Sequence, residues 1–179
     1  MPFAIHLFFD ANTETAINQV WKKLADTGIS PYLYESANRP HITLVIYQQL
    51  DLTACKPLIQ SIAAEQSSLP VSFQYIGIFP ITGAVFAGPT VTEGLLDLHH
   101  RVHETMQPIS TEPDLYYLPD QWIPHCGLAI ELAPELITPA FEISLELALP
   151  LNGKITEIGC IEFRPVNHLF GFELDGHCL

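Results

Sequence analysis

The chain has 179 residues, of which 48% are hydrophobic and 15% are charged. This composition excludes an intrinsically disordered protein, and the length predicts one compact domain over residues 1–179. Twenty acidic against seven basic residues give a formal charge of −13, which disfavours a long nucleic acid as partner but is compatible with a short nucleotide or an RNA end.

The first half of the chain predicts strand, helix, loop, strand, helix and strand, from the change between alternating and helical spacing of apolar residues. The predicted elements are a strand at 3–9, a helix capped by Asn12 or Thr13 and ending at Gly28, a strand at 41–47, a helix at 52–66 with Thr53 near its start, and a strand at 71–79.

The second half predicts the same order. Its elements are a strand at 84–88, a helix at 92–106, a strand at 124–131, a helix with Thr138 as N-cap and Pro139 as first residue, and a final hairpin of 155–163 and 169–174. Residues 141–149 fit both the helical and the strand period. The repeated order predicts a pseudo-two-fold α+β fold with two lobes.

One histidine occupies the corresponding strand in each lobe, and a proline precedes both (Pro40-His41 and Pro124-His125). Because side chains alternate along a strand, we expect His41, Thr43, Val45 and Tyr47 on one face, and His125, Gly127, Ala129 and Glu131 on one face of the later strand. Each proline fixes φ and lacks a backbone donor, which suits a strand's first residue. The pattern predicts two histidines that face each other across a cleft.

The two histidine segments are Arg39-Pro40-His41-Ile42-Thr43-Leu44 and Ile123-Pro124-His125-Cys126-Gly127-Leu128. These segments and their spacing resemble the 2H phosphoesterase superfamily. This superfamily includes RNA 2′,3′-cyclic phosphodiesterases, also called 2′-5′ RNA ligases. The resemblance covers essentially the whole chain. It implies a bilobal fold with two mainly antiparallel sheets around a central cleft and helices on the outside. It also implies a reaction that needs no metal or other cofactor.

The chemistry of a cyclic phosphodiester explains why such a site needs these residue types. Ring opening requires a base that takes a proton from water and an acid that protonates the departing oxygen, and histidine titrates near neutral pH. We therefore predict His41 and His125 as the acid/base pair, without assigning which is which. We predict Thr43 as a hydroxyl donor to a non-bridging phosphate oxygen.

The second motif departs from the family pattern. Gly127 stands where the family carries Thr or Ser, and Ile130 stands where some members carry Arg. Two readings remain open at this point: a phosphodiesterase with a differently tuned or wider site in which Gly127 contacts the substrate, and a nucleotide- or RNA-end-binding module that has lost efficient turnover.

Three further residues are candidates for substrate binding. Arg39 lies two residues before His41 and is a candidate phosphate contact. Trp122 and Tyr34 lie in the loops that precede the histidine strands, where an aromatic ring could stack on a nucleobase; Tyr116 and Tyr117 share this possibility.

Other features of the sequence predict no additional site. His99 and His103 have the i, i+4 spacing of a helical metal clasp, but no acidic residue or further ligand supports one. Because no apolar stretch could span a membrane and no basic leader precedes Phe9, we expect a soluble cytoplasmic protein, by default a monomer. We expect reduced thiols at the four cysteines, Cys55, Cys126, Cys160 and Cys178.

Overall fold

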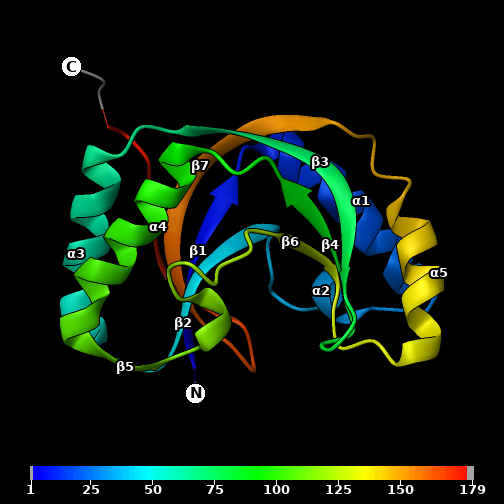
Figure 1. Cartoon of the computed structure of the whole chain (residues 1–179), viewed down its shortest axis with the longest axis horizontal. Helices are drawn as coiled ribbons and strands as arrows, with labels where there is room; N and C mark the ends of the chain where they lie inside the picture. The colour runs from blue at the N-terminus through cyan, green and yellow to red at the C-terminus, as the bar shows by residue number, and fades with distance from the viewer. Residues whose placement is uncertain (1, 177–179) are drawn as a thin grey trace.

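The computed structural model describes residues 2–176 and shows an α+β fold built on one antiparallel sheet (Figure 1). Its strands are β1 (Phe3–Phe9), β2 (His41–Leu50), β3 (Leu69–Phe79), β4 (Ala84–Pro89), β5 (Ser110–Pro113), β6 (Cys126–Ala129), β7 (Leu151–Glu162) and β8 (Asn167–Glu173). Its α-helices are α1 (Ala11–Asp26), α2 (Tyr32–Glu35), α3 (Leu52–Glu65), α4 (Glu93–Met106) and α5 (Pro134–Ser144), and two short 3-10 turns are η1 (Gln107–Ile109) and η2 (Leu115–Tyr117).

The strand order has an internal symmetry. The sheet runs β5-β2-β1-β7-β3-β4-β6, with β8 paired to β7. Exchanging β1 with β4, β2 with β6 and β7 with β3 reverses the order of the six strands from β2 to β6. The structure therefore confirms the predicted pseudo-two-fold repeat, and it shows that the last strand of each sequence repeat pairs within the opposite lobe.

The two sheets predicted from the sequence are joined. Residues Leu69 to Phe73 of β3 pair with Leu151 to Ile155 of β7, and this pairing makes the eight strands one sheet. The antiparallel strands, the two lobes and the flanking helices are as predicted. The long strands β3 and β7 arch over the molecule in Figure 1 and connect the lobes.

The helices form two pairs that the same pseudo-two-fold symmetry relates. Helix α1 contacts α5 at one end of the molecule, and α3 contacts α4 at the other (Figure 1). In addition, α1 contacts β6 of the opposite lobe and α4 contacts β2. Each histidine-bearing strand is therefore supported by a helix from the other sequence repeat.

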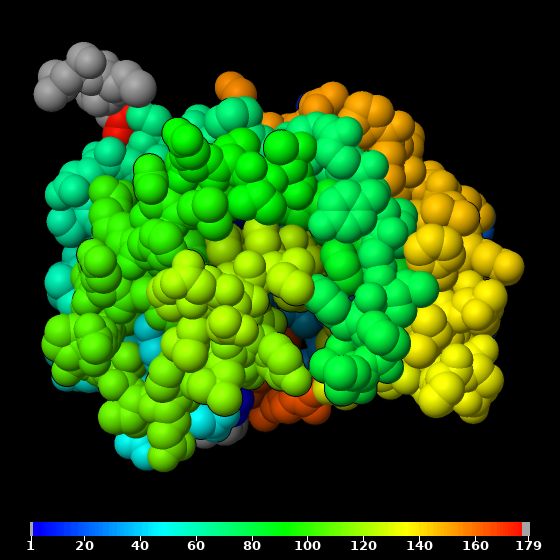
Figure 2. Space-filling view, viewed as in Figure 1, coloured from blue at the N-terminus to red at the C-terminus, as the bar shows by residue number. Residues whose placement is uncertain are grey.

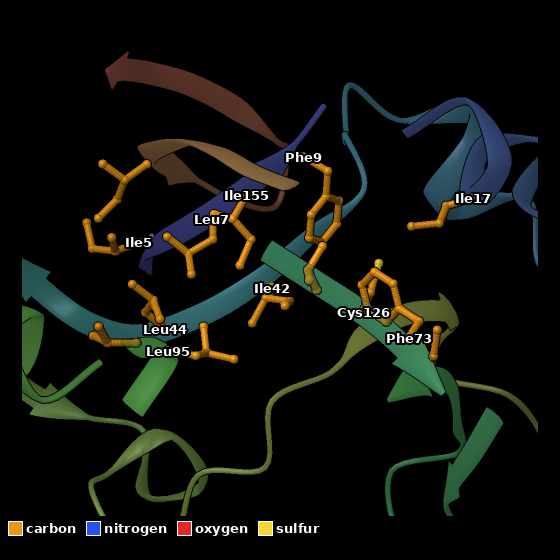
Figure 3. Close-up of a cluster of buried hydrophobic side chains, with 14 of the residues drawn as sticks. Ile5, Leu7, Phe9, Ile17, Ile42, Leu44, Phe73, Leu95, Cys126 and Ile155 are labelled. Atoms are coloured by element: carbon orange, nitrogen blue, oxygen red, sulfur yellow. The ribbon is translucent and has the colours of Figure 1, made fainter. Parts of the chain in front are cut away.

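One apolar core runs through both lobes. Figure 3 shows part of it, with Ile5, Leu7 and Ile42 on the paired strands of one lobe and Phe73 and Cys126 toward the other. These side chains are essentially inaccessible to solvent. Burial of a large apolar side chain contributes about 1.5–3 kcal/mol, so the shared core also holds the two lobes together.

Several element boundaries differ from the sequence prediction. Asp10, rather than Asn12 or Thr13, accepts the hydrogen bonds that cap α1. Asp51 caps α3, and Thr53 lies near the start of this helix as predicted. Helix α5 begins at Pro134, so the predicted start at Thr138 and Pro139 is wrong, and Pro139 lies inside the helix. The ambiguous segment at 141–149 completes this helix and then turns toward β7. Among residues 2–176, no helix is long and apolar enough to cross a membrane.

Asp10 links the start of α1 to the sheet. Its carboxylate accepts from the backbone N–H groups of Asn12 and Thr13 at 3.1 Å and from that of Lys154 in β7 at 2.5 Å. Burial disfavours ionisation, but the hydrogen bonds from Thr13, Lys154 and Asn12 outweigh it and lower the pKa of Asp10. The ionised carboxylate is the form that holds these donors.

We expect Asp10→Ala to lower the free energy of unfolding by ~1–2 kcal/mol at pH 7, because a lost N-cap has about this cost. The pKa of Asp10 is lower in the folded state, so its contribution is present above the unfolded value of 3.8 and is lost as the pH falls through the folded value. Urea unfolding at pH 7 and at pH 3 checks this. Asp97→Ala, at an exposed position on α4, is the control; an equal effect of both substitutions at pH 7 would contradict the account.

Candidate active site

His41 and His125 are held in the same way. His41 begins β2, and His125 immediately precedes β6. The Nδ1 atom of His41 lies 2.6 Å from the Arg39 carbonyl oxygen, and that of His125 lies 2.7 Å from the Ile123 carbonyl oxygen. Because a carbonyl only accepts, Nδ1 carries the proton in both neutral rings. This leaves Nε2 of each ring to meet a ligand.

Both histidines line one cavity of about 270 Å³ between the lobes. A second cavity of about 430 Å³ adjoins it and shares His125, Tyr117, Ile46 and Ile130. Figure 2 shows the surface hollowed between the yellow-green loop before β6 and the green turn between β3 and β4, which contribute to the second cavity. Residues of the first cavity include His6, Asn38, His41, Thr43, Tyr117, His125, Gly127 and Arg164.

Matching irregularities shape the two histidine strands. The pairing of β1 with β2 skips Leu44, and the pairing of β4 with β6 skips Leu128. When one residue is skipped in the pairing, the side chains after it point to the opposite face from the one that strict alternation predicts. The expectation that Val45 and Tyr47 share the face of His41 is therefore wrong: both are buried in the core, and Ile46 lines the cavity instead.

The same correction applies to β6. Ala129 is buried in the core, whereas Ile130 lines the cavity with Gly127. In the aligned registers, His6 pairs with Thr43 and Phe86 pairs with Gly127. Thr43 and Gly127 are thus equivalent positions of the two lobes, as the sequence motifs predict.

Burial sets the protonation of the histidines. It lowers the pKa of His41 to about 4, against the opposing hydrogen bond to the Arg39 carbonyl, and the nearby charges of His125 and His168 lower it further. Burial also lowers the pKa of His125, against the hydrogen bond to Ile123. Both rings are neutral at pH 7, and an anion in the cavity would favour their protonated forms.

A third histidine enters the site that the sequence prediction did not include. The ring of His6 stacks on that of His41, with centroids 3.8 Å apart and planes within 5°. In the other lobe its counterpart Phe86 packs edge-on against His125 at 5.5 Å. The lobe of His41 is therefore the more polar wall of the cleft, since it carries two imidazoles and the Thr43 hydroxyl.

Two tryptophans fix the backbone at the equivalent positions. The indole N–H of Trp122 donates to the Thr43 carbonyl at 2.9 Å, and that of Trp21 donates to the Gly127 carbonyl at 2.9 Å. One face of Trp122 stacks on His99 at 4.0 Å. Trp122 is absent from the described linings of both cavities, and its N–H holds the backbone of Thr43. Its stacking on a nucleobase stays a prediction.

The other two predicted substrate contacts also lie outside these cavities. The Arg39 guanidinium donates to Glu14 and Glu157, each at 2.9 Å, and stacks over Phe8. Tyr34 is exposed on α2 and does not line either cavity. The basic side chain at the first cavity is instead Arg164, which pairs with Glu131.

The helical histidine pair binds a loop. Both His99 and His103 place Nε2 against the carbonyl oxygen of Tyr117, at 2.9 and 2.7 Å. Within residues 2–176, no group of three or more His, Cys, Asp or Glu side chains is arranged to hold a metal ion. Cys55, Cys126 and Cys160 are free buried thiols, as predicted, and Cys178 lies outside the described residues.

Comparison with known proteins gives a family. The model of the 2'-5' RNA ligase superfamily matches residues 10–166, which include both histidine motifs. A search of curated protein sequences finds no match.

Solved structures share the fold at low sequence identity. Escherichia coli LigT complexed with NADP+ is 13% identical, with a TM-score of 0.66 over 98% of this chain and 99% of that one. TT0787 of Thermus thermophilus is 17% identical, with a TM-score of 0.67 over 99% and 100% of the two chains. Usb1 of Kluyveromyces marxianus is 12% identical, with a TM-score of 0.52 over 94% and 97%.

We expect the His41 ring to titrate near pH 4 and the His125 ring below 6.5 when histidine Cε1 protons are followed by NMR. In the unfolded chain both histidines take up a proton near pH 6.5, whereas in the folded protein they do so at lower pH. Their contribution to the free energy of unfolding is therefore present above pH 6.5 and is lost as the pH falls below that value. Added inorganic phosphate should raise the pKa of both histidines. The urea-unfolded protein is the reference, and a His41 titration at 6.5 or above would contradict the burial argument.

Proposed function

Because the chain belongs to the 2'-5' RNA ligase superfamily, a family of 2H phosphoesterases, we propose that it hydrolyses a 2′,3′-cyclic phosphodiester on a nucleotide or short RNA end. The observation that carries this proposal is the equivalent placement of His41 and His125 on one cavity, each with Nδ1 bound to a carbonyl. Two such imidazoles supply a base and an acid on the two sides of a phosphate.

The chemistry follows from that placement. One Nε2 takes a proton from the attacking water, and the other, protonated, gives its proton to the ribose oxygen as the phosphorus–oxygen bond of the ring breaks. The anionic substrate favours the protonated imidazole that the acid step needs. The product is a monophosphate, carried on the 2′ oxygen if the reaction follows that of the family's RNA-end members, and the two histidines return to their starting protonation after proton exchange with water.

The size and charge of the site favour a small substrate. The two cavities together have room for a nucleotide, and Arg164 is the one Lys or Arg side chain among their described lining residues. Structures of E. coli LigT contain NADP+, 3'-AMP and ATP, which are small nucleotides. A long RNA would need many more cationic contacts than this chain offers.

A second candidate is a binding module with little turnover. Gly127 favours it, because the second hydroxyl donor of the motif is missing and a lost hydrogen bond to a charged oxygen costs ~1.5–3 kcal/mol. Tight binding of a cyclic nucleotide without hydrolysis would support this alternative.

We expect the purified protein to hydrolyse a 2′,3′-cyclic nucleotide in the presence of EDTA. His41→Ala and His125→Ala should each lower kcat/KM by at least ~100-fold, since a positioned acid or base contributes about 10²–10⁴. His100→Ala, at an exposed position on α4, is the matched control. Thermal unfolding checks that each variant folds, and turnover that survives either active-site substitution would overturn the assignment.

Thr43→Val removes the hydroxyl and keeps the shape of the side chain. We expect kcat/KM to fall ~10- to 100-fold, which corresponds to the ~1.5–3 kcal/mol of a hydrogen bond to a charged group. Thr53→Val, exposed in the first turn of α3, is the control. Equal kcat/KM values for the wild type and Thr43→Val would contradict a role of Thr43 in the site.

A further inference from the structure

Gly127 leaves a gap where its equivalent Thr43 carries a hydroxyl. A Cβ atom built on Gly127 would lie 3.6 Å from Ile130 Cγ2 and 4.0 Å from Leu33 Cδ1, which are ordinary van der Waals distances. Neither the backbone conformation nor the neighbouring atoms therefore require glycine at this position. On this side of the cleft the second motif therefore offers no hydroxyl to a phosphate oxygen.

Tyr117 reaches the space between the two motifs. It ends η2, lines both cavities and shares the first of them with Thr43, His41 and His125. The side chain of Thr43 is near enough to influence the ionisation of the phenol. Its ring centroid lies 6.4 Å from that of His125. The phenol thus lines the same cavity as a motif residue of one lobe and lies beside the histidine of the other.

The backbone of Tyr117 is held firmly. Its carbonyl oxygen accepts from both His99 and His103, and its N–H donates to the Asp114 carbonyl at 3.1 Å. His99 also stacks on Trp122, which in turn donates to the Thr43 carbonyl. One network therefore fixes both Thr43 and Tyr117, and a preorganised donor is what stabilises developing charge effectively.

The phenol is a hydrogen-bond donor at any pH in the working range. Burial raises the pKa of Tyr117 to about 12, aided by the negative charge of Asp114 and opposed by the contact with Thr43. A neutral phenol has one O–H to donate to a ligand, as does the Thr43 hydroxyl. These two hydroxyls line one cavity, so they can donate to the phosphate in place of the two hydroxyls of the family motifs.

We propose that Tyr117 is a further catalytic residue, whose hydroxyl donates to the phosphate oxygen that Gly127 leaves without a hydroxyl partner. This inference rests on the proposed phosphodiesterase function. It explains how the chain tolerates glycine in the second motif, because η2 supplies a hydroxyl donor. Two histidines of α4 bind the backbone carbonyl of this donor residue.

Tyr117→Phe tests the proposal directly. We expect kcat for a 2′,3′-cyclic nucleotide to fall ~10- to 100-fold with a smaller change in KM, because the bond strengthens as charge develops on the oxygen. Tyr75→Phe, an exposed phenol on β3 away from both cavities, should match the wild type. Unchanged kcat in a folded Tyr117→Phe protein would overturn the inference.

A rescue experiment separates a donor from a structural residue. Gly127→Ser in the Tyr117→Phe background should restore most of the lost kcat, whereas Gly127→Ala should restore none. If Tyr117 acts only by supporting the loop or Thr43, the serine will not restore activity, and the inference fails. Thermal unfolding of every variant identifies any effect that comes from loss of the fold.

The proposed function can fail separately from this inference. If the wild type hydrolyses no 2′,3′-cyclic nucleotide, the enzyme proposal fails, and the same variants are compared by calorimetric titration with 2′-AMP. Weaker binding by Tyr117→Phe, with recovery in the Gly127→Ser background, would still support a phosphate contact. Equal affinities would overturn it.

Discussion

Backbone pairing between β3 and β7 holds the two lobes in one sheet, and the site depends on it. The pairing runs from Leu69 with Ile155 to Phe73 with Leu151, at the centre of the symmetric strand order. Because each of these strands comes from one sequence repeat and pairs within the opposite lobe, neither lobe is complete without the other repeat. The cleft between His41 and His125 is consequently fixed by main-chain hydrogen bonds and a shared core.

Within this frame, local backbone geometry aims the functional groups. The skipped residues Leu44 and Leu128 allow the chain at each motif to present a histidine and a motif residue to the cleft while the next residues fill the core. The carbonyls of Arg39 and Ile123 then select the ring nitrogen that faces a ligand. The lobes differ where Thr43 and His6 oppose Gly127 and Phe86, so the cleft combines a polar wall with an apolar one.

The strands, the repeat and the paired histidines are predictable from the sequence because those features leave local signals. The skipped residues were missed because Leu44 and Val45, like Leu128 and Ala129, are all apolar, and apolar spacing alone does not show which of them leaves the alternation. Arg39 is a candidate phosphate contact because it lies two residues before His41. Its partners Glu14 and Glu157 are distant in sequence, so the sequence alone does not show that they hold its guanidinium. The equivalence of His6 with Phe86 would have required the strand registers. The sequence predicts Tyr117 only as a stacking ring, because the cavity that it shares with Thr43 forms in the tertiary structure.

Two equivalent imidazoles are proposed to act on one phosphate between the lobes. A crystal structure of the protein with 2′-AMP is the direct test of this proposal. We expect the phosphate in the first cavity, with Nε2 of His41 and Nε2 of His125 both within hydrogen-bonding distance, ~2.7–3.2 Å, of its oxygens. A phosphate bound elsewhere, or contacted by only one of the two rings, would contradict it.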